Sequence, residues 1–274
     1  MDLLEDASTL TNKILHGLHK VNQHKKIFPT DVYDLFTASG VLLLLGQQCD
    51  KNGSPPEPCL ILNKRSRRVK QPGDLCCPGG RIIPRLDYYF AKLLTLPVFP
   101  LGRWPYWSHW RRGRPQEARR LALLFATSLR ESFEEMRLNP LGVRFLGPLQ
   151  PESLVMFERD IFPMVCWVRW QKRFRINWEV EKVVHIPLGD LLNPRYYGRY
   201  RLTMAPNIEI EFHDLTNDFP CFVHQKGDEK EVLWGATYRI VTLFLELIFG
   251  FEPPDLASLP VVPGILDENY YNGV

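Results

Sequence analysis

The nine residues Ser128–Met136, SLRESFEEM, carry three glutamates at a spacing that can do chemistry. Glu131, Glu134 and Glu135 are three and four residues apart, so their side chains lie on one side of an α-helix. Carboxylates this close repel one another unless a positive group lies among them. The two flanking arginines can supply that charge on a solvated helix face. A divalent cation can supply it in a metal site, because Mg²⁺ and Mn²⁺ prefer oxygen ligands.

The composition of the chain is that of a folded protein, with enough length for one large domain or two small ones. The formal net charge of +3 is too small to indicate nucleic acid or an anionic membrane by itself, although the arginines are unevenly distributed. No segment is long and apolar enough to cross a membrane. We therefore expect no membrane span and no nucleic-acid partner.

The cysteines lack the spacing of a disulfide framework or a zinc site. They are Cys49, Cys59, Cys76, Cys77, Cys166 and Cys221. Cys76 and Cys77 are adjacent, and adjacent cysteines make a poor disulfide. The first ten residues, MDLLEDASTL, begin acidic and lack the basic and apolar regions of a signal peptide. These features predict a reduced protein of the cytoplasm.

The elements that must position the glutamates can be read from the periodicity. Residues 3–26 have apolar side chains at helical spacing, and Pro29 marks the start of a second helix. SGVLLLLG and PCLILNKRS predict two strands of a hairpin. Residues 81–120 are rich in Trp, Arg and Pro, which predicts a partly helical insertion over a surface.

The glutamates then fall on a helix over residues 115–137. The core-facing positions of this helix are predicted to be Leu121, Leu124, Phe125, Leu129, Phe133 and Met136.

Downstream, the chain alternates strand and helix patterns. VRFLGPL, IFPMVCWVRW and IEIEFHD predict strands, and WEVEKVVHIPLGDLLNPRYY predicts a strand, a turn and a short helix. EVLWGATYRIVTLFLELIFG predicts a closing helix, and the proline-rich residues 253–274 predict an irregular tail.

With these elements in place, the sequence resembles the Nudix hydrolases. The family box is written G-x5-E-x7-R-E-U-x-E-E-x-G-U, and Gly80 matches its first glycine. Its second half is matched by Arg130, Glu131, Glu134, Glu135 and Leu138.

Within that family, the sequence is most similar to the coenzyme A pyrophosphatases. Residues 61–80, ILNKRSRRVKQPGDLCCPGG, resemble the stretch that precedes the box in that branch. The matching positions are Leu62, Arg65, Ser66, Lys70, Gly73, Pro78, Gly79 and Gly80. WGATYRIV likewise resembles the W-G-x-T that opens the C-terminal helix of the branch.

The sequence also departs from the box. Between Gly80 and Arg130 lie 49 residues, so an insertion falls inside the box. The box places a glutamate that anchors the arginine eight residues before it, and Ala122 stands at that position here. If the insertion begins after Asp87, this aspartate can take the role of the glutamate. The glycine near the end of the box is Arg137.

The resemblance implies a domain plan. It predicts a Nudix-like α/β/α sandwich with a mixed β-sheet over residues 36–252, interrupted by an inserted loop or helical segment at about 88–116. A helical arm over residues 1–35 precedes this domain and packs on it or forms a homodimer, and the tail of residues 253–274 follows.

The resemblance also implies the site residues. Glu131, Glu134 and Glu135 hold Mg²⁺ or Mn²⁺, and Glu131 or Glu134 orients or deprotonates water. Arg130 and Asp87 are structural. Substrate binding is assigned to Arg65, Arg67, Arg68, Lys70, Gly79 and Gly80, since arginines suit phosphate oxygens and glycines permit close approach. Glu179 or Glu181 is a candidate fourth ligand or base, and His185 is expected to be a core residue.

The implied function is metal-dependent hydrolysis of coenzyme A or acyl-coenzyme A to 4′-phosphopantetheine and adenosine 3′,5′-diphosphate. Alternatives are the same chemistry on NADH, ADP-ribose or another nucleoside diphosphate derivative, and a catalytically weak binding module. The module would use the cluster of Trp104, Tyr106, Trp107, His109, Trp110, Arg111 and Arg112, which otherwise packs on its own domain.

Overall fold

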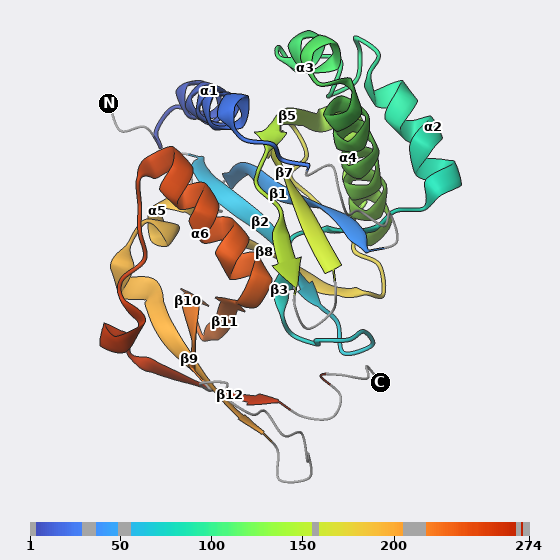
Figure 1. Ribbon diagram of the computed structural model, residues 1–274. Helices are drawn as coiled ribbons and strands as arrows, with labels where there is room; N and C mark the ends of the chain where they lie inside the picture. Colours follow the sequence, from blue (N-terminus) through green and yellow to red (C-terminus); the bar gives the residue numbers. More distant parts are fainter. Residues whose placement is uncertain are drawn as a thin grey trace.

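The long apolar runs of the sequence form strands that are buried on both faces. In β1 (Ala38–Gln48), residues 42–45 are four leucines without exposed surface. A strand buried in this way needs a covering layer on each face of its sheet. Figure 1 shows these layers, with α4 (Pro115–Met136) on one side of the sheet and α6 (Gly235–Phe249) on the other. The predicted α/β/α sandwich is confirmed.

The computed structural model describes residues 4–28, 37–48, 56–154, 159–204, 218–266 and 270. Within these ranges the central sheet has eight strands, with β3-β2-β1-β7-β5 as its main path, β4 paired with β1, β6 with β7 and β8 with β2. The bounds are β2 (Glu57–Arg65), β3 (Leu75–Cys76), β4 (Gly79–Arg81), β5 (Val143–Pro148), β6 (Glu152–Leu154), β7 (Arg159–Val168) and β8 (Val180–Pro187).

The sheet is mixed, because β1 runs parallel to β7 and antiparallel to β2. The predicted hairpin of β1 and β2 is confirmed, with Leu44 opposite Ile61. The remaining pairs of this sheet are antiparallel.

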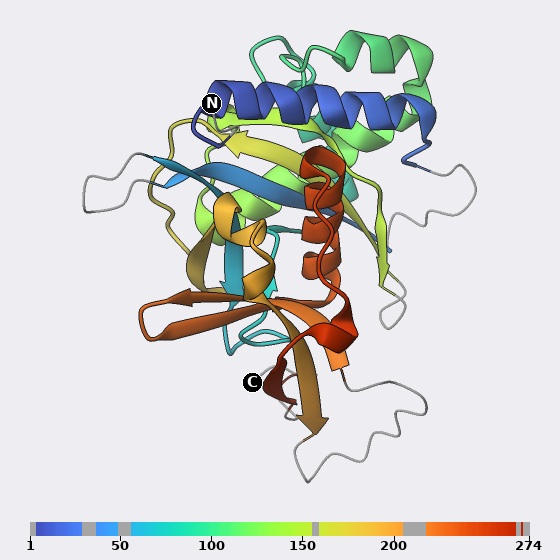
Figure 2. The ribbon, with the colours of Figure 1, turned by 90° about the vertical axis from the view of Figure 1, so that its left-hand side faces the viewer.

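The other helices cover the sandwich from outside. They are α1 (Ala7–His24), α2 (Pro84–Leu94), α3 (Trp107–Gly113) and α5 (Leu188–Leu191), with 3₁₀ turns at Pro140–Gly142, Pro194–Tyr196 and Leu256–Ser258. α2 and α3 pack on α4, while α1 packs against β5 and α6. Figure 2 shows α1 lying along the edge of the molecule. The predicted second helix at Pro29 lies outside the described residues.

A second sheet follows β8 in the chain. Its strands are β9 (Tyr197–Met204), β10 (Asp218–Lys226), β11 (Glu229–Trp234) and β12 (Val261–Leu266), in the order β11-β10-β9-β12. Two predictions are corrected here. Residues 231–234, assigned to the closing helix, belong to β11, whose side chains alternate in burial, and the tail predicted to be irregular contains β12. The strand predicted at IEIEFHD lies outside the described residues.

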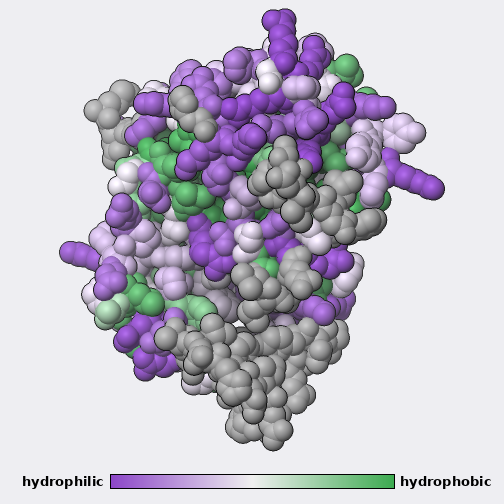
Figure 3. All heavy atoms as spheres, in the orientation of Figure 1, coloured by the Kyte–Doolittle hydropathy of each residue, from purple (hydrophilic) through white to green (hydrophobic). Residues whose placement is uncertain are grey.

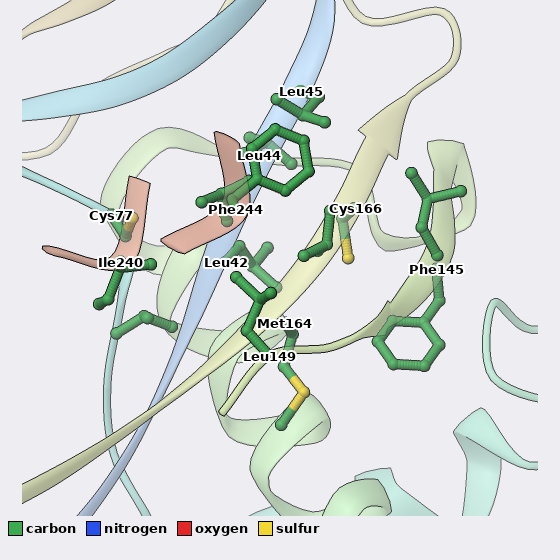
Figure 4. Packing of buried hydrophobic residues seen from close by; sticks show 14 of the residues in the cluster. Leu42, Leu44, Leu45, Cys77, Phe145, Leu149, Met164, Cys166, Ile240 and Phe244 are labelled. Atoms are coloured by element: carbon green, nitrogen blue, oxygen red, sulfur yellow. The ribbon is translucent and has the colours of Figure 1, made fainter. Parts of the chain in front are cut away.

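The core lies between the sheet and its helices (Figure 4). Leu42 and Leu44 of β1, Met164 of β7, and Ile240 and Phe244 of α6 gather in this cluster.

Phe133 of α4 was predicted to face the core, but it is 44% exposed. The guanidinium of Arg137 lies over its ring instead, 5.0 Å from the centroid. No described helix combines the length and apolar character that crossing a membrane requires.

Candidate active site

Helix α4 holds the predicted site residues in its last two turns. Pro115 is the first residue of the helix. Its C-cap is Arg137, whose φ of 54° is left-handed. Glycine is the usual residue in this conformation at a helix C-terminus. The departure from the Nudix box at Arg137 therefore coincides with a backbone position that suits glycine.

A buried ion pair joins α4 to α2. Arg130 Nε donates to Asp87 Oδ1 at 2.7 Å, and Asp87 has no exposed surface. The Asp87 carboxylate also accepts from the Ile83 amide at 2.7 Å and from Thr127 Oγ1 at 2.9 Å. Ala122, at the position of the missing glutamate, is buried. Asp87 thus anchors Arg130 from α2, the role that the resemblance gave it.

The other nitrogens of Arg130 bind the carboxylates of the same helix. Nη2 lies 3.1 Å from Glu131 Oε1, Nη1 lies 3.2 Å from Glu134 Oε2, and the Arg81 carbonyl accepts from Nη2 at 2.8 Å. Burial alone would lower the pKa of Arg130, but its hydrogen bond with Asp87 and the charge of Glu131 outweigh it and raise that pKa. Arg130 is therefore a permanent cation.

Glu135 faces the sheet, away from Arg130. Asn63 Nδ2 of β2 donates to Glu135 Oε2 at 2.9 Å. Burial raises the pKa of Glu135 to about 8, Glu131 and Glu179 add to this rise, and the Gly79 amide opposes it by donating to the carboxylate. Burial likewise raises the pKa of Glu131, against the effect of Arg130. Burial and mutual repulsion therefore favour the protonated form of these carboxyls.

The glycine pair brings backbone into contact with this region. A Cβ on Gly80 would lie 2.5 Å from Glu131 Cδ, so any larger residue would displace this carboxylate. Gly79 has a φ of 148°, and a Cβ there would lie 2.3 Å from the Gly40 carbonyl oxygen of β1. Both glycines belong to β4, which pairs with β1. Their small size is required by close approach and not only by a turn.

A small cavity of about 30 Å³ opens beside Glu135. Its lining consists of Asn63, Arg65, Val69, Cys76, Glu135, Glu179 and Val180. This volume suits an ion or one or two waters. Two carboxylates and one guanidinium therefore share a space too small for a nucleotide.

The loop after β2 carries the predicted substrate-binding cations. Arg65 lines the cavity and its Nε donates to the Lys70 carbonyl at 2.7 Å, whereas Arg67, Arg68 and Lys70 are exposed above it. The structure thus brings Arg65 to the carboxylates and leaves the other three on the surrounding surface.

Both ends of this loop are held in place. The Ser66 amide donates to the Glu179 carbonyl at 2.8 Å. At the far end, Asp74 accepts from Trp234 Nε1 at 3.0 Å and from the Tyr270 hydroxyl at 2.7 Å. The cations are therefore attached to a fixed frame.

Of the other acidic candidates, Glu179 lines the cavity, while Glu181 lies 3.3 Å from Lys64 Nζ on the exposed side of β8. Burial lowers the pKa of His185, and its ring lies 6.1 Å from that of Phe174, as suits a packing residue. Asn63, which was not predicted, is the buried neighbour of Glu135. The sequence signal that could have identified it is a polar residue directly after the apolar run CLIL.

The donor set suits a hard divalent cation, because it consists of carboxylates beside a cradle that a Cβ on Gly80 would fill. The described residues nevertheless hold no group of three His, Cys, Asp or Glu side chains placed to bind an ion together. Glu131 and Glu134 lie against Arg130, and Glu135 lies against Asn63. Ion binding at all three requires that Glu131 and Glu134 turn from Arg130.

The aromatic insertion packs on its own domain. Trp104, Trp107 and Trp110 are buried, and the Trp104 ring lies 5.1 Å from that of Phe145 in β5. The Tyr106 ring stacks on His19 of α1 at 3.4 Å. These indoles are not free to stack a nucleobase, whereas His109, Arg111 and Arg112 of the same cluster are exposed.

No family model and no curated protein matches this sequence. Solved structures with some similarity are Nudix proteins. One is a Nudix hydrolase from M. smegmatis at 10% identity, covering 57% of this chain and 73% of that chain, with a TM-score of 0.35. Another is a C. elegans Ap4A hydrolase at 11% identity, covering 57% and 83%, with a TM-score of 0.35. A MutT/nudix family protein from Enterococcus faecalis has 9% identity, covers 89% and 75%, and has a TM-score of 0.39.

Proposed function

We propose that this chain is a metal-dependent hydrolase of the Nudix type that cleaves a diphosphate linked to a nucleoside. The observation that carries the proposal is the arrangement at the end of α4. Glu131 lies against Gly80, Glu135 accepts from the Gly79 amide, and Arg130, fixed by Asp87, contacts Glu131 and Glu134. Their oxygens suit Mg²⁺ or Mn²⁺.

Each residue has a role in this reaction. Bound at the three glutamates, the cation supplies positive charge to the non-bridging oxygens and the leaving group of a phosphoryl transfer. Glu131 or Glu134 takes a proton from the attacking water. Arg65, beside the cavity, binds the diphosphate.

The substrate we propose is coenzyme A or an acyl-coenzyme A, cleaved to 4′-phosphopantetheine and adenosine 3′,5′-diphosphate. Arg67, Arg68 and Lys70 are exposed on the loop beside the cavity and are the proposed partners of the 3′-phosphate. The same site on NADH or ADP-ribose is the second candidate. Five unpaired cysteines among the described residues accord with the cytoplasmic location that we propose.

The test is mass-resolved product analysis with coenzyme A, 3′-dephospho-coenzyme A, acyl-coenzyme A, NADH, ADP-ribose and diadenosine polyphosphates in Mg²⁺ or Mn²⁺. We expect adenosine 3′,5′-diphosphate from coenzyme A. In Glu134→Gln we expect the rate of its release to fall by about 100-fold or more. Glu246→Gln, at an exposed glutamate of α6, is the matched control and retains full activity.

Other outcomes would change the assignment. If a different substrate is cleaved, the proposed reaction stands and the substrate assignment changes. If Glu134→Gln stays within about twofold of the native rate, the proposed ligand set is wrong. If none of these substrates is cleaved, the proposed function is wrong.

A further inference from the structure

Helix α2 has a buried inner face and an outer face with exposed apolar side chains. Asp87, Ala91 and Leu94 are its buried residues, and α2 packs on α4. Outside this face, Leu86 is 51% exposed, Leu93 is 48% exposed and Tyr89 is 71% exposed. Positions separated by three and four residues lie on one side of a helix, so these three side chains form a stripe.

The stripe continues beyond the end of the helix. Leu96 and Val98, in the turns that follow α2, are exposed as well. α2 lies at the periphery of the molecule, separated from the sheet by α4 (Figure 1). An apolar surface of this extent on one short segment is typical of an interaction site, because burying it removes apolar area from water.

Cations border the stripe. Arg85 and Lys92 are exposed on the neighbouring side of α2, and Lys92 Nζ lies 5.8 Å from the centre of the Tyr89 ring. From Arg81 to Arg120 the sequence has nine Lys and Arg residues against Asp87 and Glu117. This segment has a net charge of +7, so the rest of the chain, which brings the total to +3, is net negative.

The cationic character extends along the insertion. Arg111, Arg112 and Arg119 of α3 and α4 are exposed. Figure 3 shows hydrophilic side chains gathered over the upper part of this face, where α1, α3 and the start of α4 lie. The one acidic residue of α2 is Asp87, which is buried against Arg130. The exposed surface of α2 therefore carries no carboxylate of its own.

Charge decides which partner fits. A second copy placed on this face by a two-fold axis would bring two positive surfaces together, which like-charge repulsion opposes. Nucleic acid would satisfy the cations and leave the leucines and valine in water. An anionic lipid surface satisfies both, since its headgroups attract the cations and its acyl boundary buries the apolar stripe.

We propose that α2 and the turns after it form a docking surface for anionic membrane lipids, with the helix lying in the plane of the membrane. Binding needs no rearrangement, because the residues that hold α2 on α4 are on its inner face. One element of this size gives reversible attachment. The docking surface is independent of hydrolysis at the candidate active site.

The experiment is co-sedimentation of the full chain with vesicles of phosphatidylcholine, with and without phosphatidylglycerol. We expect binding at least about tenfold stronger to the anionic vesicles, weakening as salt rises. Leu86→Ser with Leu93→Ser removes the apolar contact, and Arg85→Gln with Lys92→Gln removes the charge, so each pair lowers binding by about tenfold or more.

The matched control is Val261→Ser with Ile265→Ser, two exposed apolar residues of β12, which leaves binding unchanged. Circular dichroism checks that every variant is folded. Equal binding to neutral vesicles, or binding unaffected by Leu86→Ser with Leu93→Ser, overturns the proposal. So does a dimer in analytical ultracentrifugation that these two substitutions dissociate, or binding of duplex DNA in place of vesicles.

Discussion

At the scale of residues, Arg130 is the centre of the candidate site. Its guanidinium contacts Asp87 on one side and Glu131 and Glu134 on the other. Asp87 is fully buried and holds the guanidinium in place, whereas Glu131 and Glu134 remain able to exchange Arg130 for another cation. Because Arg130 is positively charged, it can bind the structural acid and the exchangeable acids at once.

Replacement of Asp87 by Ala should cost about 3–5 kcal/mol of unfolding free energy, because it leaves the buried Arg130 without its anchor. Urea denaturation measures the change. Arg201→Ala, which breaks an exposed ion pair with Asp218, is the comparison and should destabilise the protein far less. A loss at Asp87 no larger than this would show that the pair contributes little.

The pKa of Glu135, about 8 against an ordinary value of 4.5, makes stability depend on pH. The folded protein binds this proton more tightly than the unfolded chain does. The resulting stabilisation is complete below pH 4.5 and is lost as pH rises through about 8.

In a chelator, the native protein should therefore lose stability between about pH 5 and pH 8, by more than about 1 kcal/mol relative to Glu135→Gln. Urea denaturation at each pH measures this, with Glu246→Gln as control. Parallel curves for the native protein and Glu135→Gln would contradict the assignment.

At the scale of elements, β4 is short but fixes the distance between the sheet and α4. Gly79 lies against the backbone of β1, and Gly80 lies against the Glu131 side chain. The two glycines meet different obstacles, since backbone cannot yield and the end of a side chain can. Their substitutions should therefore have different consequences.

Gly79→Ala should destabilise the protein by about 2 kcal/mol or more, because its Cβ would overlap the Gly40 carbonyl at a positive φ. Gly80→Ala should cost less than about 1 kcal/mol, since the Glu131 side chain can move. Gly80→Ala should instead lower hydrolysis by about tenfold or more, because it displaces that carboxylate. Thermal unfolding and initial rates separate the two effects. The reverse pattern would contradict this account.

The sequence predicted those elements whose pattern is local. The 22-residue α4 follows from helical spacing, and β1 and β2 follow from apolar runs bounded by turns. The second sheet was missed, since β11 leads into α6 with no loop between them and β12 depends on pairing with distant β9. Phe133 was misassigned because the periodicity does not show where the covering layer ends.

The candidate site was predictable to a similar degree. The glutamates, the glycines and Asp87 were named from the sequence. Asn63 was missed, as its role depends on the register of β2 against α4, which no local pattern encodes.

At the scale of the whole molecule, the Trp-rich segment between α2 and α4 is part of the core. Its indoles fill the space between α1, α4 and β5, so it completes the outer layer of the sandwich. This packing gives the aromatic residues of the segment a structural role.

Trp110→Ala should therefore cost about 3–5 kcal/mol, the range for a buried aromatic. Chemical denaturation measures it. Arg112→Ala, an exposed neighbour on α3, should change stability by less than about 0.5 kcal/mol. A small effect at Trp110 would mean that the insertion can leave the core at little cost.

The lining of the cavity has a consequence for how the protein is made. Asn63, Glu135 and Glu179 come from three segments that are far apart in the chain, and the Asn177 amide joins the last of these to the Glu135 carbonyl at 2.8 Å. Such a site has high contact order and cannot assemble from any one hairpin or helix. During synthesis it is incomplete until β8 has left the ribosome, so nascent chains ending before Glu179 can fold helices but carry no complete cavity.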